Sequence, residues 1–245
     1  MSKQSKATKR YPGGAAMLAA AAVVVMFAAG CDSRVDVTGP RFTLPTVPAL
    51  PTVPSAATIT EPRAIAGVYA VTLQAVGHVR IALGGAESLT ISAPENVMPL
   101  LTSEVSAGRL ILGRDSGSYE GQASDIQYEI SLQQLDELAL EGVGAILAER
   151  VETSLFSARV NGVGEIRASG RADRQEVQVA GVGGYIAPTL ESRVTHVNIS
   201  AGNAVVWATE RLEGWVGFGC TLEYWGDPEV SIQGRGTVRR IGLKS

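Results

Sequence analysis

A glycine-rich segment recurs along the second half of the chain and constrains the fold more than any other feature. The copies read LALEGVGAI, FSARVNGVGEI, EVQVAGVGGYI, HVNISAGNAVV, EGWVGFGCTL and EVSIQGRGTV, each a strand-like run followed by a Gly-rich turn and an aliphatic residue. The aliphatic residues recur at steps of 20 and then 16, at Ile146, Ile166, Ile186, Val206, Leu222 and Val238. Because a coil of this length cannot bury its apolar side alone, neighbouring coils must stack. The repeat therefore predicts an all-β fold, a single right-handed β-solenoid with stacked short strands and Gly-rich corners.

The glycines of the repeat are expected to form the corners of the coils. A sharp corner needs a positive φ or a backbone packed closely against the next coil, and glycine permits both. A phosphate-binding loop would instead lead into a helix, often with a lysine, whereas strands follow here. In the third copy the glycines come one residue early relative to Ile186, which predicts a bulge there. The predicted corner glycines are Gly142, Gly144, Gly162, Gly164, Gly181, Gly183, Gly217, Gly219, Gly234 and Gly236.

Short runs of alternating apolar and polar residues precede the repeat. Alternation with a period of two predicts strands with one buried face. These runs lie at residues 68–73, 79–83, 89–91, 109–112 and 126–130. A short helical or irregular connection is expected at residues 95–104, and the sequence shows no long amphipathic helix.

The N-terminus has the order of a secretory signal. Residues 3–10 are basic, residues 15–29 are uncharged and apolar, and Gly30-Cys31 follows. The tetrapeptide Ala28-Ala29-Gly30-Cys31 resembles the lipobox of bacterial lipoproteins, which implies removal of residues 1–30 and a lipid on Cys31. The alternatives are ordinary cleavage near Ala29, which leaves Cys31 free, and an uncleaved single-span anchor. The apolar run is shorter than the roughly 20 residues that a spanning helix needs.

Residues 31–62 are predicted to be a lipid-anchored, proline-rich linker. They contain six of the chain's eleven prolines, and LPTVPALPTVP repeats proline every three residues. Proline fixes φ and removes an amide donor, so we expect an extended, polyproline-like tether, with a plain disordered linker as the alternative. The folded domain is therefore expected at residues 63–245.

The charge of the exported part argues against nucleic acid as a partner. Residues 1–30 carry four basic residues and no acid, so the remainder has 17 basic and 24 acidic residues and a charge of −7. Non-specific nucleic-acid binding requires a basic face. The expected partners are the membrane, through the N-terminal lipid, and a protein or glycan ligand.

Residues with catalytic or ligating chemistry are few and scattered. His78 and His196 lie on separate predicted strands, and the sequence has no HExxH, CxxC or Gly-x-Ser-x-Gly motif. Cys220 has no histidine near it in sequence, and burial as a small apolar residue is favoured over reactivity. We therefore expect no metal, no cofactor and no enzyme activity.

Acidic and basic residues alternate around the predicted corners. A glycosidase or lyase on a β-helix would gather carboxylates in one groove, whereas opposite charges on neighbouring coils stabilise and solubilise a solenoid face, which is the favoured interpretation. The residues concerned are Glu141, Glu165, Asp173, Glu176 and Glu191, with Arg150, Arg159, Arg167 and Arg171.

Four aromatic residues gather late in the chain. Exposed, they would stack on sugar rings or contact a partner. The favoured interpretation is that they plug the open end of the solenoid, which would otherwise expose an aggregation-prone edge. They are Trp207, Trp215, Tyr224 and Trp225.

The arrangement of motifs resembles the head GIN domain family, also called putative auto-transporter adhesins. The resemblance covers about residues 63–242, in the order Gly67-Val68-Tyr69-Ala70-Val71, then Gly142-Val143-Gly144 and Gly162-Val163-Gly164, then Tyr224-Trp225-Gly226-Asp227-Pro228 and Gly234-Arg235-Gly236. Val, Phe or Arg stands where the family often has Ser. The resemblance implies a β-solenoid and a role in adhesion.

These observations together predict a non-enzymatic lipoprotein of the bacterial cell envelope, on its periplasmic or surface side, that presents a solenoid face for binding or adhesion. Two alternatives stay open. One is a periplasmic structural or signalling protein that binds a protein partner, and the other is a carbohydrate-active enzyme on the same fold.

Overall fold

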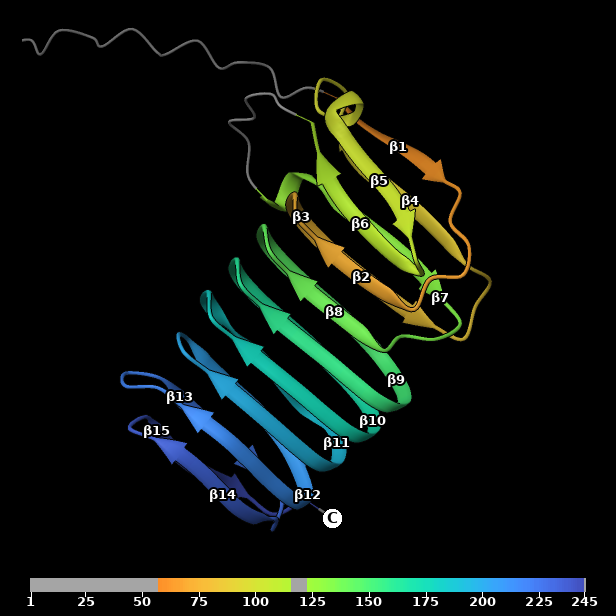
Figure 1. The fold of residues 1–245 in the computed structure, drawn as a ribbon. Coiled ribbons are helices and arrows are strands. Elements are labelled where there is room, and N and C mark those ends of the chain that lie inside the picture. The colour runs from red at the N-terminus through yellow and green to blue at the C-terminus, as the bar shows by residue number, and fades with distance from the viewer. Residues whose placement is uncertain (1–56, 116–122, 245) are drawn as a thin grey trace, which may run out of the picture. The chain divides into compact units, whose positions relative to one another are not determined.

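The computed structural model describes residues 57–115 and 123–244. The predicted signal peptide, Cys31 and the linker as far as residue 56 lie outside the described residues. The described chain is almost entirely β and forms a β-solenoid of about five turns (Figure 1). Among these residues, none forms a helix that is long and apolar enough to cross a bilayer.

Four long, bent strands make the regular coils, and each pairs in parallel with the next. Each strand bends once, so its first half lies in one sheet and its second half in another. The bend leaves register shifts between neighbours, as at Ala168/Gly170. The strands are β9 (Val143–Val160), β10 (Val163–Val179), β11 (Val182–Ile199) and β12 (Asn203–Val216).

The first sheet contains the first halves of the coils and extends beyond them at both ends. Its order is β1-β4-β7-β3-β9-β10-β11-β12-β13-β15. The added strands are β1 (Thr58–Arg63), β4 (Ser88–Pro94), β7 (Gln127–Leu132), β3 (Val76–Leu83), β13 (Thr221–Trp225) and β15 (Thr237–Gly242).

The second sheet contains the second halves of the coils and faces the viewer in Figure 1. Before the coils come β5, β6, β2 and β8, in that order across the sheet, and β14 pairs with β12 after them. Their bounds are β5 (Leu101–Ser106), β6 (Arg109–Arg114), β2 (Ala70–Leu73), β8 (Glu137–Leu140) and β14 (Glu229–Gly234). Short 3-10 turns occupy η1 (Met98–Leu100) and η2 (Ala123–Asp125).

The N-terminal end of the solenoid is closed by antiparallel strands. β1 pairs with β4, β4 with β7, and β5 with β6, all antiparallel. β1 uses Thr58–Pro62, which the sequence assigned to the linker, so the ordered domain begins earlier than residue 63. Pro62 is tolerated because β1 is an edge strand that pairs with β4 alone, and proline, which lacks an amide hydrogen, is accommodated in edge strands. The connection expected at residues 95–104 is η1 followed by the first part of β5.

The C-terminal end carries one more coil than the aromatic residues suggested. β14 lies beyond β12, and β15 lies beyond β13. The interpretation that the four aromatic residues plug the open end is therefore wrong. Inward positions of this last coil, such as Val230 and Val238, are exposed because no further coil covers them.

The core is a set of ladders of inward side chains between the two sheets. Ile146, Ile166, Tyr185 and Ala204 occupy one ladder, in register and fully buried. The step of 20 predicted Ile186 and Val206 at the next two positions of this ladder, and both predictions are wrong. The third coil is one residue shorter up to this point, so Tyr185 takes the core position and Ala204 lies beside it. The bulge predicted between the glycines of the third copy and Ile186 is absent, because residues 182–186 pair one to one with residues 163–167 of β10. The irregularity comes after Ile186, at the bend of the coil, where two residues, including Pro188, oppose one on β10.

Candidate binding face

The outward surface of the second sheet carries two parallel rows of side chains, which we call the return face. Because the strands are parallel and in register, residues at the same position in successive coils lie beside one another. The inner row consists of Glu137, Ser157, Glu176, His196, Glu213 and Ser231. The outer row consists of Arg159, Gln178, Asn198, Trp215 and Gln233.

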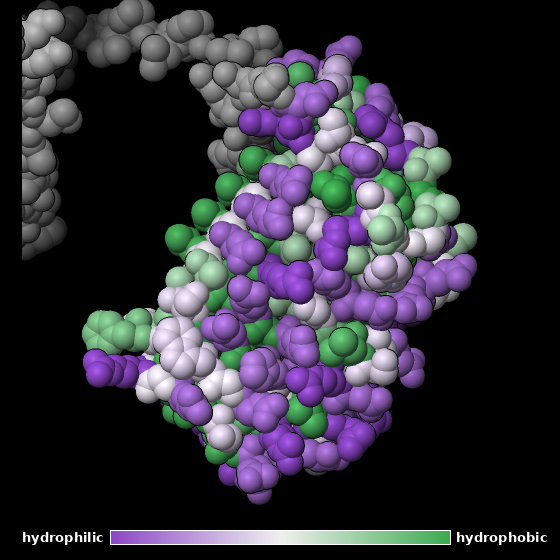
Figure 2. All heavy atoms as spheres, in the orientation of Figure 1, coloured by the Kyte–Doolittle hydropathy of each residue, from purple (hydrophilic) through white to green (hydrophobic). Residues whose placement is uncertain are grey.

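Strand alternation explains why these residues face solvent. In β10, Val177 lies between Glu176 and Gln178, and Val179 follows Gln178. Both valines are buried in the core. The same pattern repeats in β11 around Val197 and Ile199. A period of two thus places one polar residue outward for each apolar residue inward. Figure 2 shows that the face over these strands is mainly hydrophilic.

Three hollows follow one another along the return face and share lining residues. The first, of about 330 Å³, lies over Asp136 and Glu137 and reaches Arg159 and Glu176. The second, of about 180 Å³, is lined by Arg159, Glu176 and His196 among others. The third, of about 440 Å³, runs from His196 to Gln233. Together they form a continuous track across the coils from β8 to β14.

A carboxylate between two arginines anchors one end of this track. The guanidinium of Arg109 donates to both Glu137 oxygens, at 3.1 and 2.6 Å, and also to Thr72 Oγ1 at 3.2 Å. Arg159 Nη1 donates to Glu137 Oε1 at 2.7 Å. The hydrogen bond from Arg109 lowers the pKa of Glu137, and the charges of both arginines act in the same direction against burial. Glu137 is thereby held ionised, with its side chain only 17% exposed.

The other end of the track combines a tryptophan with polar side chains. His196 Nδ1 lies 3.8 Å from Glu213 Oε1 in the inner row. Beside them, Trp215 is 42% exposed and stands between Asn198 and Gln233 in the outer row. Such a surface offers an aromatic face together with hydrogen-bond donors and acceptors.

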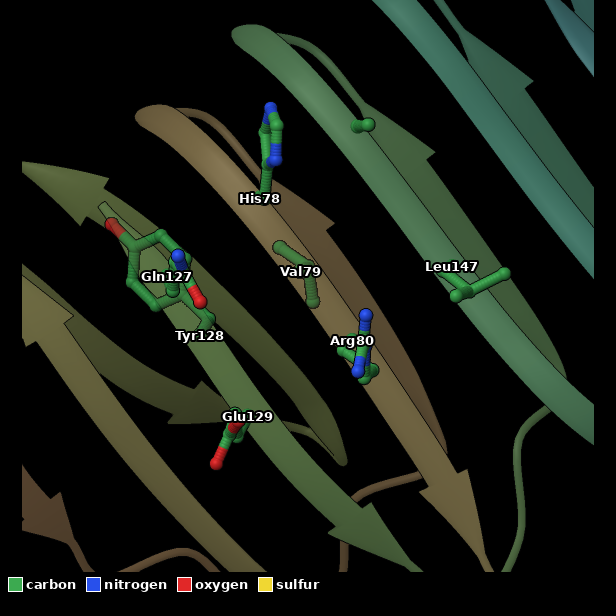
Figure 3. Close-up of a pocket in the computed structure, with 8 residues that line it drawn as sticks. His78, Val79, Arg80, Gln127, Tyr128, Glu129 and Leu147 are labelled. Carbon is green, nitrogen blue, oxygen red and sulfur yellow. The ribbon is translucent and has the colours of Figure 1, made fainter. Parts of the chain in front are cut away.

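A further hollow lies on the outward side of the first sheet (Figure 3). It measures about 290 Å³ and takes His78 and Arg80 from β3, Gln127 and Glu129 from β7, and Leu147 from β9. Below it, burial raises the pKa of Tyr128 to about 12. This hollow covers three strands and does not continue into the later coils.

The acids singled out in the sequence are distributed over the coils with partners of their own. Ion pairs join Glu165 to Arg167 at 2.7 Å, Glu176 to Arg174 at 3.0 Å, Glu191 to Arg171 at 3.3 Å and Asp173 to Arg193 at 4.0 Å. Glu141 accepts from Gln74 Nε2 at 3.0 Å. Within residues 57–115 and 123–244, no three His, Cys, Asp or Glu side chains are grouped closely enough to hold a metal ion.

The corner glycines stack in two columns at the edge of the coils. A Cβ on Gly162 would overlap the carbonyl of Gly142, and one on Gly181 would overlap that of Gly162. Gly144, Gly164 and Gly183 form the second column and all have positive φ. Gly236 approaches the carbonyl of Gly217, and Gly234 that of Val216. Gly219, with φ of +78°, has open space around it.

The residues between the corner glycines leave an apolar edge beside the return face. Val143, Val163 and Val182 are exposed, Val182 to 73%, and Phe218 is exposed to 87%. Figure 2 shows hydrophobic side chains along the edge where the chain turns from coil to coil in Figure 1. Cys220, two residues after Phe218, is buried and is a free cysteine.

The structure places the four late aromatic residues in three different environments. Trp207 and Trp225 are neighbours in the first sheet, and Lys244 Nζ lies 5.0 and 4.8 Å from their ring centres. Tyr224 packs against the core. Trp215 alone of the four lies on the return face.

Sequence reasoning singled out Arg159, Glu176, His196 and Trp215 but missed Gln178, Asn198, Glu213 and Gln233. A signal for them exists in the repeat. The copies EVQVAG, HVNISA, EGWVGF and SIQGRG can be aligned on their corners. The first residue of each copy then falls in the inner row and the third residue in the outer row. The register of the strands makes these columns into rows on one face.

The fold and the face together define a β-solenoid with a hollowed, polar outward surface that carries both charged and neutral side chains. The chain belongs to the family described as putative auto-transporter adhesin, head GIN domain, which it matches over residues 69–228. Comparison with curated proteins gave no match.

Comparison with solved structures gave several similar chains. The crystal structure of a putative adhesin from Bacteroides fragilis is 22% identical, with a TM-score of 0.64, and the match covers 77% of this chain and 99% of that one. A putative lipid binding protein from Parabacteroides distasonis is 21% identical, with a TM-score of 0.44, covering 75% of this chain and 96% of that one. The similarity to the Bacteroides fragilis structure concerns the fold.

Proposed function

We propose that the chain is a non-enzymatic binding module of the bacterial cell envelope, anchored through a lipid on Cys31, that holds its ligand on the return face. The observation that carries the proposal is the continuous track of three hollows across the coils, from Glu137 to Gln233. Membership of an adhesin family supports a binding role and a place in the envelope.

The charges along the track support binding rather than catalysis. A glycosidase needs one carboxyl group kept protonated, with a raised pKa, to act as a general acid. The carboxylate of Glu137, only 17% exposed, has the opposite tendency, because two arginines lower its pKa. The two arginines that bind Glu137 fix its side chain, which suits a structural role in the return face.

Protease shaving of cells that produce the full chain tests the envelope placement. An antibody against the solenoid follows the protein, and we expect the protease to digest the solenoid on intact cells. In the variant Cys31→Ser, which cannot take the lipid, we expect the chain to be lost from the membrane fraction. Protection of the solenoid until the cells are lysed would contradict presentation on the surface.

Photo-crosslinking on the same cells tests which face binds. Benzoylphenylalanine at Gln178, in the outer row, should form adducts of higher mass. The same residue at Val205, which faces outward from the first sheet, serves as the matched control and should form none. Equal adducts from both positions, or none from Gln178, would contradict binding at the return face.

A further inference from the structure

The outer row of the return face is uncharged over four successive coils. Gln178, Asn198, Trp215 and Gln233 lie side by side on β10, β11, β12 and β14. The corresponding surface of the first sheet is different, because ion pairs such as Arg167–Glu165 and Arg239–Glu223 occupy it. Among the described residues, the amide groups of Gln178, Asn198 and Gln233 have no hydrogen-bond partner within the protein. Each amide therefore has a donor and an acceptor available to a ligand.

Trp215 is positioned as a platform in this row. Its six-membered ring extends over the corner at Gly217, where a Cβ would lie only 2.8 Å from Cη2. The absence of a side chain at Gly217 thus leaves room for the ring beside the largest of the three hollows. An indole exposed next to a hollow offers an apolar face that stacks against flat ligand surfaces.

Most of the backbone of this face is closed to recognition of a peptide by strand addition. β10, β11 and β12 are hydrogen-bonded on both sides, so the free strand edge of the track is that of β14, which pairs with β12 alone. A ligand that lies across the coils must be recognised by side chains. Glu176 and Glu213 in the adjoining row disfavour a polyanion.

The spacing of the row suits a linear polymer of polar units. Neighbouring strands are about 4.8 Å apart, so the track from β8 to β14 extends about 24 Å. Along it, β10, β11 and β14 each present one side-chain amide, and β12 presents the indole of Trp215. Sugar units present apolar C–H faces for an indole and hydroxyl groups that both donate to and accept from amides. The chemistry of the row matches such units more closely than it matches charged or purely apolar ligands.

We propose that the return face binds a neutral linear glycan that runs across the coils, with one sugar ring stacked on Trp215 and neighbouring hydroxyl groups bonded to Asn198 and Gln233. This proposal rests on the proposed function and specifies the ligand class of the same face. Phe218, the most exposed aromatic residue of the described chain, lies on the corner edge and is expected to play no part.

Titration of the purified full chain with cellohexaose, xylohexaose and laminarihexaose tests the proposal. The chain should be kept in a detergent without a sugar headgroup, and binding followed by calorimetry and tryptophan fluorescence. At least one of these neutral probes should bind, and Trp215→Ala should weaken its affinity about tenfold or more because the stacking surface is lost. Asn198→Ala should weaken it less, and Phe218→Ala, the matched exposed aromatic, should bind like the wild type. Circular dichroism checks that each variant is folded.

Failure of this proposal is distinguishable from failure of the proposed function. No binding of any neutral probe at millimolar concentration, or equal binding by Trp215→Ala, would overturn the glycan assignment. If crosslinked adducts still formed from Gln178, the return face would remain a binding face for another ligand. Stronger binding of a charged probe, oligogalacturonate, than of the neutral ones would also overturn the assignment.

Discussion

The carbonyl oxygen of Gly144 occupies the space into which a Cβ on Gly164 would point, one coil further along the solenoid. Gly164 also has a φ of +129°, which side chains rarely adopt. We therefore expect Gly164→Ala to lower the free energy of unfolding by about 3 kcal/mol or more, because the coils must separate locally to admit the methyl group. Urea denaturation followed by circular dichroism measures the change.

Gly84 provides the control for this substitution. Its φ is +97°, but no atom lies within 4 Å of the position of a Cβ. Gly84→Ala should cost only about 1–2 kcal/mol, from the backbone conformation alone. If both substitutions cost the same, close stacking of the coils would not be what requires glycine at Gly164.

These glycine columns are also why much of the fold was predictable. The Gly-Val-Gly turns recur in the sequence, and the structure places strands and corners where that repeat predicts them. The prediction for Ile186 was wrong because a fixed step of 20 ignores a coil of 19 residues from Gly164 to Gly183. The aromatic prediction was wrong although the last copy of the repeat, EVSIQGRGTV, lies after all four aromatic residues in sequence. That copy forms β14 and the start of β15, which lie beyond Trp215 and Trp225.

The return face was less predictable than the corners. His196 and Trp215 were recognised as single residues, but their neighbours depend on the register of parallel strands 17–20 residues apart. The Arg109–Glu137–Arg159 arrangement could not be foreseen for a stronger reason. Arg109 precedes the repeat and reaches Glu137 because β2 lies between β6 and β8.

Glu137 should make the stability of the chain depend on acid pH. Its pKa in the folded state is lowered from the ordinary value of 4.5, chiefly by the hydrogen bond from Arg109. Its stabilising contribution is therefore present above that ordinary value and is lost as the pH falls through the lowered pKa. Glu137→Gln should lower the free energy of unfolding by about 1 kcal/mol at neutral pH and make its decline in acid shallower.

Glu210 offers a comparison for Glu137. Arg193 lowers its pKa too, but this pair is more exposed, with 53% of the Arg193 side chain and 54% of the Glu210 side chain accessible to solvent. Glu210→Gln should therefore have the smaller effect, and the difference should be visible in urea titrations at neutral and acid pH. An acid decline that is unchanged in Glu137→Gln would contradict the role given to this carboxylate.

A buried polar cluster inside the coils should be sensitive to the loss of one member. Gln175 is fully buried; its Nε2 donates to the Tyr185 hydroxyl, and its Oε1 accepts from Ser192 Oγ at 3.4 Å. Gln175→Leu keeps much of the volume but leaves a buried hydroxyl without its partner. We expect a loss of about 1–3 kcal/mol in the free energy of unfolding.

Removal of the partner hydroxyl should restore part of this loss. In the double variant Gln175→Leu with Tyr185→Phe, the hydroxyl is gone, while Ser192 still bonds to Thr195 at 2.6 Å and to the Trp207 carbonyl at 3.0 Å. The two changes should therefore cost less together than the sum of the single costs, by about 1 kcal/mol. Strict additivity in a double-mutant cycle would show that this hydrogen bond contributes nothing to stability.

Tyr128 should make the chain sensitive to alkaline pH in the opposite sense from Glu137. Its hydroxyl is buried, has no hydrogen-bond partner among the described residues, and has a pKa raised from 10.0 to about 12 by burial. The phenol ionises at lower pH in the unfolded chain than in the folded chain. The free energy of unfolding should therefore fall by about 1.4 kcal/mol per pH unit between pH 10 and about pH 12.

The variant Tyr128→Phe removes this pH-dependent loss of stability. The variant should be as stable as the wild type or more so near pH 8, because a buried hydroxyl without a partner is costly, and it should lose less stability on passing to alkaline pH. Urea titrations on both sides of pH 10 make the comparison, and equal slopes in the two proteins would mean that the phenol is solvated in the folded chain.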